Sequence, residues 1–368
     1  MSQDREHLRS WIGLSSIPGI GRITFRRLVA HFGSAGRVLS ASENEQREYA
    51  GLSGKVISEL RSFPWQERAE EELAKAEAAG VAIITAADPA YPGPLLNTPD
   101  PPLFLYIKGS LLPEDENAVA MVGSRTPTHY GLTVTRSMAA EFAARRITVV
   151  SGMARGIDTQ AHRGALDAQG RTIAVLGCGI DTAYPPENRG LMEEISRHGA
   201  VVTENPFGTQ PESGYFPARN RIISGLAAGT VIIEAAEDSG SLITADYTLK
   251  QNRKLFAVPG NISSPLSRGT NSLIKQGALL VETAGDVLNG LDIYKGSRST
   301  DTVDRQLPPL TPDEASVFKV LTDEPKHIDV IMAASGSAPG RLSGVLITLE
   351  LKGLAKQLPG KYFVREML

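Results

Sequence analysis

Short loops of glycine and serine follow several β-branched runs of this 368-residue chain, and their composition suits the binding of phosphate groups. Small residues let backbone N–H groups approach an anion closely, and the start of a following helix adds about half a positive charge. Several such loops along one sheet edge would serve several phosphates, whereas a single nucleotide needs only one or two. These loops contain Gly123, Ser124 and Arg125; Ser151, Gly152 and Arg155; Gly177, Cys178 and Gly179; and Ser239, Gly240 and Ser241.

Arg125 is the charged residue of the first loop, directly after the run AVAMVGS. A guanidinium fork binds phosphate in a fixed geometry and stays charged at physiological pH. The alternative is a structural salt bridge to a neighbouring carboxylate. The loop Gly177–Gly179 is a weaker signal, because it lacks the third glycine of the dinucleotide-binding fingerprint and is also typical of a tight strand-to-helix turn.

Phe216 supplies the candidate aromatic surface. Pro217 suits the first turn of a helix, so Phe216 is expected just outside that helix, beside Arg219 and Arg221. An exposed ring next to guanidinium groups is a stacking platform for nucleobases, worth ~1–3 kcal/mol per base in any sequence. The alternative is a hydrophobic staple, in which Phe216 packs onto its own helix.

Signals for catalysis are weak. The chain lacks HExxH, CxxC, GxxxxGK[ST] and GxSxG motifs, and its one cysteine, Cys178, excludes an internal disulfide and a multi-cysteine metal site. Asp158 and His162 lie four residues apart on one expected helix face, which allows either an acid–base pair or a capping aspartate beside a structural histidine. We expect no catalytic residues, no metal and no cofactor.

Composition limits the functional classes further. Hydrophobic residues make up 41% of the chain and charged residues 21%, as in an ordinary globular protein. The net charge of −3 argues against wrapping duplex DNA through bulk positive charge, so any nucleic-acid site must be local. The N-terminus is too polar for a secretory signal and no apolar run reaches ~18 residues, so we expect a cytoplasmic protein without membrane contact.

Strands and helices that alternate over residues 103–296 must position these loops. The β-branched runs are AVAMV, ITVV, TIAVL, AVVT, TVIIEA, LFAV and ALLV, with helical patterns between them. This alternation predicts an α/β fold with a parallel, doubly wound sheet covered on both faces. Ligands of such sheets lie outside the carboxyl ends of the strands, where the glycine and serine loops are expected.

The flanking segments predict smaller domains. Residues 1–80 have helical periodicity, and the passage 86–109, at the start of the 81–296 domain, contains many prolines and is interpreted as an ordered linker. Residues 297–307 form a polar linker, and 308–368 have three helical patterns followed by a PGK hairpin, typical of a winged helix.

A further phosphate-binding turn is suggested near the N-terminus. The run Ile17–Gly21 has the glycines of a helix-hairpin-helix turn, whose N–H groups can bind a phosphate beside Arg22, Arg26 and Arg27. A purely structural hairpin explains the same residues equally well. The last helical pattern of the chain contains only Arg341 and Lys352 as basic residues, which favours a protein-contact role for the winged helix over duplex recognition.

The order of these motifs resembles the DNA-processing protein A (DprA/Smf) family. The resemblance covers residues of about 95–290 and rests on MVGSRTPTHYG, SGMARGIDTQAHRGAL, ENPFG, FPARNRIISGL, EAAEDSGSLITA, FAVPGNI and GTNSLIKQGA. It implies an extended Rossmann-like, doubly wound, mostly parallel sheet. It also implies an N-terminal helical domain of the SAM or helix-hairpin-helix type and a C-terminal winged-helix domain.

The resemblance also implies a function. Members of the family bind single-stranded DNA without sequence preference, form homodimers and load RecA recombinase onto incoming DNA during natural transformation, with no established catalytic reaction. The corresponding DNA-binding residues here are Gly123, Ser124, Arg125, Ser151, Gly152, Arg155, Phe216, Arg219, Asn220, Arg221, Ser239, Gly240, Ser241, Asn271 and Lys275.

Two other hypotheses remain. A Rossmann-type nucleotide-processing hydrolase would use Asp158, His162 or Glu234 as acid or base, but the loop that is Pro-Gly-Gly-x-Gly-Thr in such hydrolases is replaced here by Ser239–Leu242. A structural adaptor that acts only through protein contacts would leave the phosphate-binding loops without a role.

Overall fold

The structure, a computed structural model, describes residues 3–49, 51–293, 309–322 and 324–366. Helices dominate its first part, as predicted from the periodicity there. They are α1 (Gln3–Ser16), α2 (Arg22–Phe32), α3 (Ala35–Ser40), α4 (Glu43–Glu48), α5 (Gly54–Ser62) and α6 (Trp65–Ala78). Residues 297–307, predicted as a linker, lie outside the described residues.

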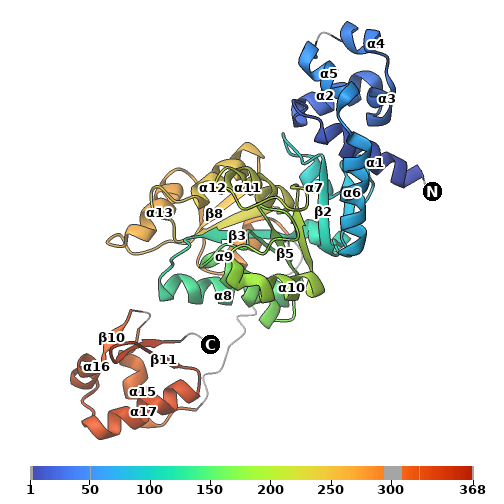
Figure 1. The fold of residues 1–368 in the computed structure, drawn as a ribbon. Coiled ribbons are helices and arrows are strands. Elements are labelled where there is room, and N and C mark those ends of the chain that lie inside the picture. Colours follow the sequence, from blue (N-terminus) through green and yellow to red (C-terminus); the bar gives the residue numbers. More distant parts are fainter. Residues whose placement is uncertain (1–2, 50, 294–308, 323, 367–368) are drawn as a thin grey trace.

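A nine-stranded sheet forms the centre of the described chain (Figure 1). Its strands are β1 (Ala82–Thr85), β2 (Phe104–Gly109), β3 (Val119–Gly123), β4 (Val149–Ser151), β5 (Thr172–Val175), β6 (Ala200–Thr203), β7 (Gly229–Ile233), β8 (Lys254–Ala257) and β9 (Leu279–Leu280). Each of the seven β-branched runs in the sequence corresponds to one strand from β3 to β9. The prediction of a mostly parallel, doubly wound sheet is confirmed.

The order β1-β2-β6-β5-β4-β3-β7-β8-β9 explains where a ligand site forms. The chain builds outward from β3 through β4, β5 and β6, then returns and continues on the other side of β3 with β7, β8 and β9. In this order every pair of adjacent strands from β6 across to β9 is parallel. The direction of winding therefore changes between β3 and β7, and a crevice opens at the carboxyl ends of strands at such a point.

Helices cover both faces of the sheet because side chains alternate along each strand. Val119 and Met121 of β3 pack on one side with α8 and α9, whereas Ala120 and Val122 pack on the other with α11. The helices of this region are α7 (Gly93–Leu96), α8 (His129–Ala144), α9 (Ile157–Asp167), α10 (Arg189–His198), α11 (Tyr215–Leu226), α12 (Ser241–Lys250), α13 (Arg268–Lys275) and α14 (Ala284–Gly290), with 3₁₀ turns at Pro113–Asn117, Pro186–Asn188 and Pro265–Ser267.

The passage 86–109 is not only a linker. It contains α7 and β2, and β2 pairs antiparallel with both β1 and β6. The many prolines before Phe104 made the whole passage resemble a linker. Because none of them interrupts the FLYIKG run, that run is free to form a strand. The sheet therefore begins at β1 and carries two antiparallel strands at this edge.

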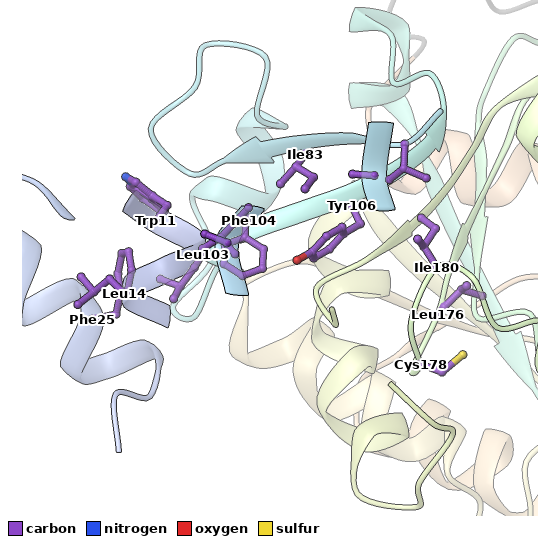
Figure 2. Packing of buried hydrophobic residues seen from close by; sticks show 14 of the residues in the cluster. Trp11, Leu14, Phe25, Ile83, Leu103, Phe104, Tyr106, Leu176, Cys178 and Ile180 are labelled. Carbon is purple, nitrogen blue, oxygen red and sulfur yellow. The ribbon is translucent and has the colours of Figure 1, made fainter. Parts of the chain in front are cut away.

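The N-terminal helices share a hydrophobic core with that edge of the sheet (Figure 2). Trp11, Leu14 and Phe25 of the helices belong to the same cluster of buried side chains as Phe104 and Tyr106 of β2. The ring of Trp11 lies 4.9 Å from that of Phe25, and the Tyr106 ring meets Phe104 edge-on at 5.6 Å. This continuous apolar packing joins the N-terminal helices to the edge of the sheet.

The C-terminal region has the predicted winged-helix elements and its own core. It contains α15 (Pro312–Val320), β10 (Lys326–His327), α16 (Ile328–Ser335), α17 (Pro339–Leu351), β11 (Ala355–Leu358) and β12 (Tyr362–Arg365). The hairpin β11–β12 turns at the PGK sequence, as predicted. Among the described residues no single helix is long and apolar enough to cross a membrane, although the bent pair α16–α17 meets that criterion when its two helices are taken together.

Candidate nucleic-acid interface

A cleft of about 640 Å³ lies at the change of winding between β3 and β7. Its walls come from the loop after β3, the first turn of α11 and the start of α12, which are distant in sequence. Gly123 ends β3 where a Cβ atom would approach the Ile233 carbonyl oxygen to 1.8 Å, so this position requires glycine. The predicted site residues that line the cleft are Gly123, Ser124, Arg125, Phe216, Arg219, Asn220, Ser239, Gly240 and Ser241.

Arg125 is exposed at the wall of this cleft. Within the described ranges no carboxylate comes within 4.0 Å of its guanidinium group, so the alternative of a structural salt bridge does not describe it. Its Cζ atom lies 5.9 Å from the centroid of the Phe216 ring. A permanent positive charge and an aromatic ring therefore face the same space.

Phe216 lies inside the first turn of α11, which begins at Tyr215, and not outside the helix as the sequence suggested. The hydrophobic staple uses the residue before the N-cap, so that arrangement does not apply here. The half-buried ring rests on Gly177, where a Cβ atom would come within 2.9 Å of Phe216 Cδ1. The GxG loop after β5 thus makes room for the ring, which is a packing role.

Tyr184 is a cleft residue that the sequence analysis missed. Its ring lies 5.3 Å from the Phe216 ring with an interplanar angle of 35°, and the residue is 37% exposed. The available signal was an aromatic residue in the AYPPEN loop, which follows β5 at the carboxyl end of the sheet. The loop has no helical or strand periodicity, so nothing in the sequence indicated that this ring points toward Phe216.

Arg219 lies beneath the cleft and is only 5% exposed. Its guanidinium group donates hydrogen bonds to the carbonyl oxygens of Gly152 and Val175, at the ends of β4 and β5. Burial, together with the nearby charge of Arg125, lowers the pKa of Arg219 to about 10 despite the opposing effect of Asp158. Arg219 therefore remains charged at neutral pH and ties together the loops that form the cleft floor.

Arg221 lies outside the cleft. Its buried guanidinium group pairs with Glu204 at 2.6 Å and with Asp100 at 3.1 Å. Arg22 of α2 also pairs with Asp100 at 2.9 Å and with Glu204 at 3.3 Å. Arg26 joins the network at Asp100, at 3.1 Å. We call these five residues the interdomain charge network.

The interdomain charge network also involves two of the candidate phosphate-binding residues near the N-terminal turn. Arg22 and Arg26, which were considered as phosphate-binding residues, are engaged by carboxylates that connect the helices to the sheet. Gly19 has a φ of +88°, which lets the chain turn between α1 and α2. These contacts favour the structural hairpin over a phosphate-binding helix-hairpin-helix turn.

The remaining predicted residues do not line the cleft. The Ser151 hydroxyl donates to the Met121 carbonyl oxygen at 2.6 Å, Gly152 is buried against Arg219, and Arg155 forms an ion pair with Glu187. The Asn271 side chain accepts from the Gly260 N–H at 3.2 Å and donates to its carbonyl oxygen at 3.0 Å. Lys275 is exposed at the end of α13. Thus the loop after β4 supports the cleft from below.

The serine loop before α12 is ordered by its own hydroxyl groups. The Ser239 and Ser241 hydroxyl oxygens lie 2.8 Å apart, and the Ser241 N–H donates to the Ser239 hydroxyl at 3.3 Å. Asn220 of α11 donates from its amide to the Gly240 carbonyl oxygen at 3.4 Å. The starts of α11 and α12 are therefore linked, and both bring partial positive charge to the cleft.

The candidate acid–base residues have structural partners. Burial raises the pKa of Asp158, which accepts hydrogen bonds from the N–H groups of Gly152 and Ala154. Burial lowers the pKa of His162 to about 3, and its Nδ1 lies 2.7 Å from the Thr172 hydroxyl. Glu234 accepts from the N–H of Thr128 at 2.8 Å.

The cleft itself holds few titratable side chains. Asp158 is the one carboxylate among the described residues that line it. Burial raises the pKa of the Cys178 thiol to about 11, so the thiol is protonated at neutral pH. Across the described ranges, no group of three or more His, Cys, Asp or Glu side chains is placed to hold a metal ion.

Comparison with known proteins places the chain among DNA-processing proteins. Residues 82–292 match the family described as DNA recombination-mediator protein A, and residues 302–361 match the DprA winged helix domain. Protein Smf of Synechocystis is 33% identical over 389 residues, which cover 96% of this chain and 98% of that protein.

Two solved structures are also similar. The DNA processing protein A of Streptococcus pneumoniae aligns with a TM-score of 0.66 and 32% identity, over 78% of this chain and 98% of that one. The DNA processing protein A of Helicobacter pylori, described for its single-stranded DNA binding mode, aligns with a TM-score of 0.52 and 31% identity, over 58% of this chain and 96% of that one.

Proposed function

The chain belongs to the DprA/Smf family of DNA-processing proteins, and we propose that it binds single-stranded DNA without sequence preference in the cleft between β3 and β7. The observation that carries this proposal is the unpaired charge of Arg125 beside the ring of Phe216. The relative from Helicobacter pylori, which is described for its single-stranded DNA binding mode, supports the same conclusion.

The chemistry of the cleft favours a single strand over a duplex. Arg125 and the start of α12 offer positive charge to phosphate groups, while Phe216 offers a ring to a nucleobase. Bases of a duplex are already stacked on their neighbours and cannot use such a ring. A protein of net charge −3 also lacks the broad basic surface that would hold a duplex by its backbone alone.

Within this proposal the predicted residues have two roles. Arg125, Phe216, Asn220 and the loop Ser239–Ser241 contact the strand. Arg219 and Gly152 position those contacts from below, since they connect the ends of β4 and β5. We retain the predicted division into domains 1–80, 81–296 and 308–368, with the site in the second of them.

We further propose that the protein is not an enzyme and loads a RecA-type recombinase onto the strand it holds. The hydrogen-bonded Asp158, the neutral His162 and the hydrogen bond of Glu234 to Thr128 argue against a hydrolase. Recombinase assembly on single-stranded DNA, followed with and without the purified protein, tests the loading step. An assembly rate that the protein leaves unchanged would remove this part of the proposal.

A homodimer is the expected working form. The edge strand β9 exposes Leu279 and Leu280, which are 43% and 51% accessible, and apolar residues on an open sheet edge suit pairing with a second copy. Light scattering at micromolar concentration is expected to give twice the chain mass of 39.3 kDa. A mass equal to one chain would contradict this expectation.

The central experiment is a mobility shift with single-stranded and duplex oligonucleotides of the same length at one salt concentration. Wild type is expected to prefer the single strand, and Arg125→Ala to weaken that binding by about 10- to 100-fold, because a charge-assisted contact is lost. Phe216→Ala is expected to weaken it by about 5- to 100-fold. Arg136→Ala, which changes an exposed arginine outside the cleft, is the matched control. Equal binding by wild type and both cleft variants would overturn the proposal.

A further inference from the structure

The ring of Tyr184 occupies the cleft without a structural partner for its hydroxyl group. Among the described residues, no hydrogen bond from this hydroxyl is formed, and the residue is 37% exposed. A tyrosine held in place for stability normally anchors its O–H, because a buried O–H needs a partner. Tyr184 is instead positioned by its ring, which packs against Phe216.

The two rings are in contact but are not stacked face to face. Their centroids lie 5.3 Å apart and their planes are inclined by 35°, which is a tilted arrangement. They come from different segments, the loop after β5 and the first turn of α11. Both line the same cleft, so a strand bound there would meet two rings in succession.

A second cation lies close to Tyr184. Arg155 is 58% exposed at its side chain, and its pKa is raised by its hydrogen bond and charge pairing with Glu187 and by the nearby Tyr184 hydroxyl. Arg155 does not line the cleft itself. Tyr184 therefore lies near a further exposed guanidinium group outside the cleft, which is already paired with Glu187.

We propose that Tyr184 is a second base-stacking residue, which holds the nucleobase next to the one on Phe216. This inference rests on the proposed function, because it assumes that the cleft holds single-stranded DNA. It adds a binding residue to the cleft. We expect the aromatic ring of Tyr184 to contact the base, because its hydroxyl group forms no hydrogen bond among the described residues.

The first test separates the ring from its hydroxyl. Tyr184→Phe is expected to bind a single-stranded oligonucleotide as wild type does, whereas Tyr184→Ala is expected to bind it about 5- to 100-fold more weakly. Equal affinity of Tyr184→Ala and wild type overturns the inference but leaves the proposed function intact. Failure of wild type itself to bind single strands overturns both.

A double-mutant cycle separates base stacking from support of Phe216. If Tyr184 only braces the Phe216 ring, then Tyr184→Ala has no further effect on affinity in the Phe216→Ala background. If each ring holds its own base, the two losses combine, and the double variant is weaker than either single variant. The first result contradicts the inference and the second supports it.

A fluorescent probe gives a readout that a purely structural role does not produce. Tyr184→Trp is expected to lose emission when oligo(dT) stacks on the introduced indole. Tyr215→Trp is the matched control, because Tyr215 is 38% exposed in the same turn as Phe216 but lines a different cavity. Equal responses of the two variants, after correction for the native Trp11 and Trp65, contradict the inference.

Discussion

The cleft and the interdomain charge network use arginine in opposite ways. Arg125 in the cleft is exposed and has no carboxylate partner within the described ranges, whereas Arg221 is buried and meets both Glu204 and Asp100. A paired, buried guanidinium is a structural element whose loss leaves unpaired charge inside the protein. An unpaired, exposed one is available to a ligand, so pairing rather than residue type distinguishes the two regions.

Helix α11 serves both regions because of its geometry. Arg219 and Arg221 are two residues apart, and an α-helix turns by about 100° per residue, so their side chains leave the helix in nearly opposite directions. Arg219 extends under the cleft to the Gly152 carbonyl oxygen, while Arg221 extends to Glu204. The two arginines of one short motif therefore have different roles: Arg219 supports the cleft, and Arg221 belongs to the interdomain charge network.

The largest expected effect is on the network side. Arg221→Ala removes a buried charge and leaves Glu204 and Asp100 with a poorer set of partners, so we expect a loss of about 3–5 kcal/mol in the free energy of unfolding, measured by urea titration. Arg136→Ala is the control, because its pair with Asp167 is exposed and its loss is expected to cost less than about 1 kcal/mol. Similar losses for both variants would contradict the comparison.

The sequence predicted the fold well because the fold depends on local patterns. Short β-branched runs and helical stretches identified β3 to β9, and turn residues identified the hairpin β11–β12. The strand β2 was missed, since the prolines before Phe104 suggested a linker. Its pairing with β1 and β6 joins segments that are separate in the sequence, and the residue pattern of one segment does not indicate which strands it pairs with.

The site was only partly accessible to the same reasoning. The glycine and serine loops and Phe216 were found because ligands of such sheets bind at the carboxyl ends of the strands. Whether an arginine is paired cannot be read from its neighbours in sequence, because the partners of Arg221 lie 17 and 121 residues away. Tyr184 was missed for the same reason, as its contact with Phe216 joins a loop to the first turn of α11.

The next expected effect concerns the floor of the cleft. A Cβ atom at Gly152 would come within 2.3 Å of Arg219 Nη1, so Gly152→Ala forces the buried guanidinium group to move. We expect a loss of about 1–3 kcal/mol in the free energy of unfolding, together with weaker binding of single-stranded DNA. Gly214→Ala, where a Cβ atom meets no atom within 4 Å, is the control for both measurements.

Salt dependence sharpens the contrast between a few directed contacts and a broad basic surface. If the cleft neutralises roughly 3–5 phosphates, the logarithm of the binding constant is expected to fall with the logarithm of salt concentration with a slope of about −2 to −4. Arg125→Ala removes one of these contacts and is expected to make the slope shallower by about 0.7. A wild-type slope near −8, measured by fluorescence anisotropy, would place most of the contacts elsewhere.

The smallest expected effect is the pH dependence of the network. Although burial opposes ionisation of Asp100, the charges of Arg22, Arg221 and Arg26 together lower its pKa below the ordinary value. A carboxylate with a lowered pKa stabilises the folded state above its unfolded pKa of about 3.9, and that contribution is lost as the pH falls through the folded value.

Asp100→Asn tests this contribution directly. At pH 7 the variant is expected to be less stable than wild type by no more than about 1 kcal/mol, since Asp100 is partly exposed and its pairs are screened. The difference in urea midpoint should stay constant from pH 7 to about pH 4 and shrink only below it, because wild-type Asp100 becomes neutral only as the pH falls through a folded pKa lower than the ordinary value. Affinity for single-stranded DNA at pH 7 should not change, because Asp100 does not line the cleft. A stability difference that stays constant even as the pH falls to about 2 would show that Asp100 acts through shape or hydrogen bonding, and the network would then differ from the cleft in packing and not in its pairing of charge.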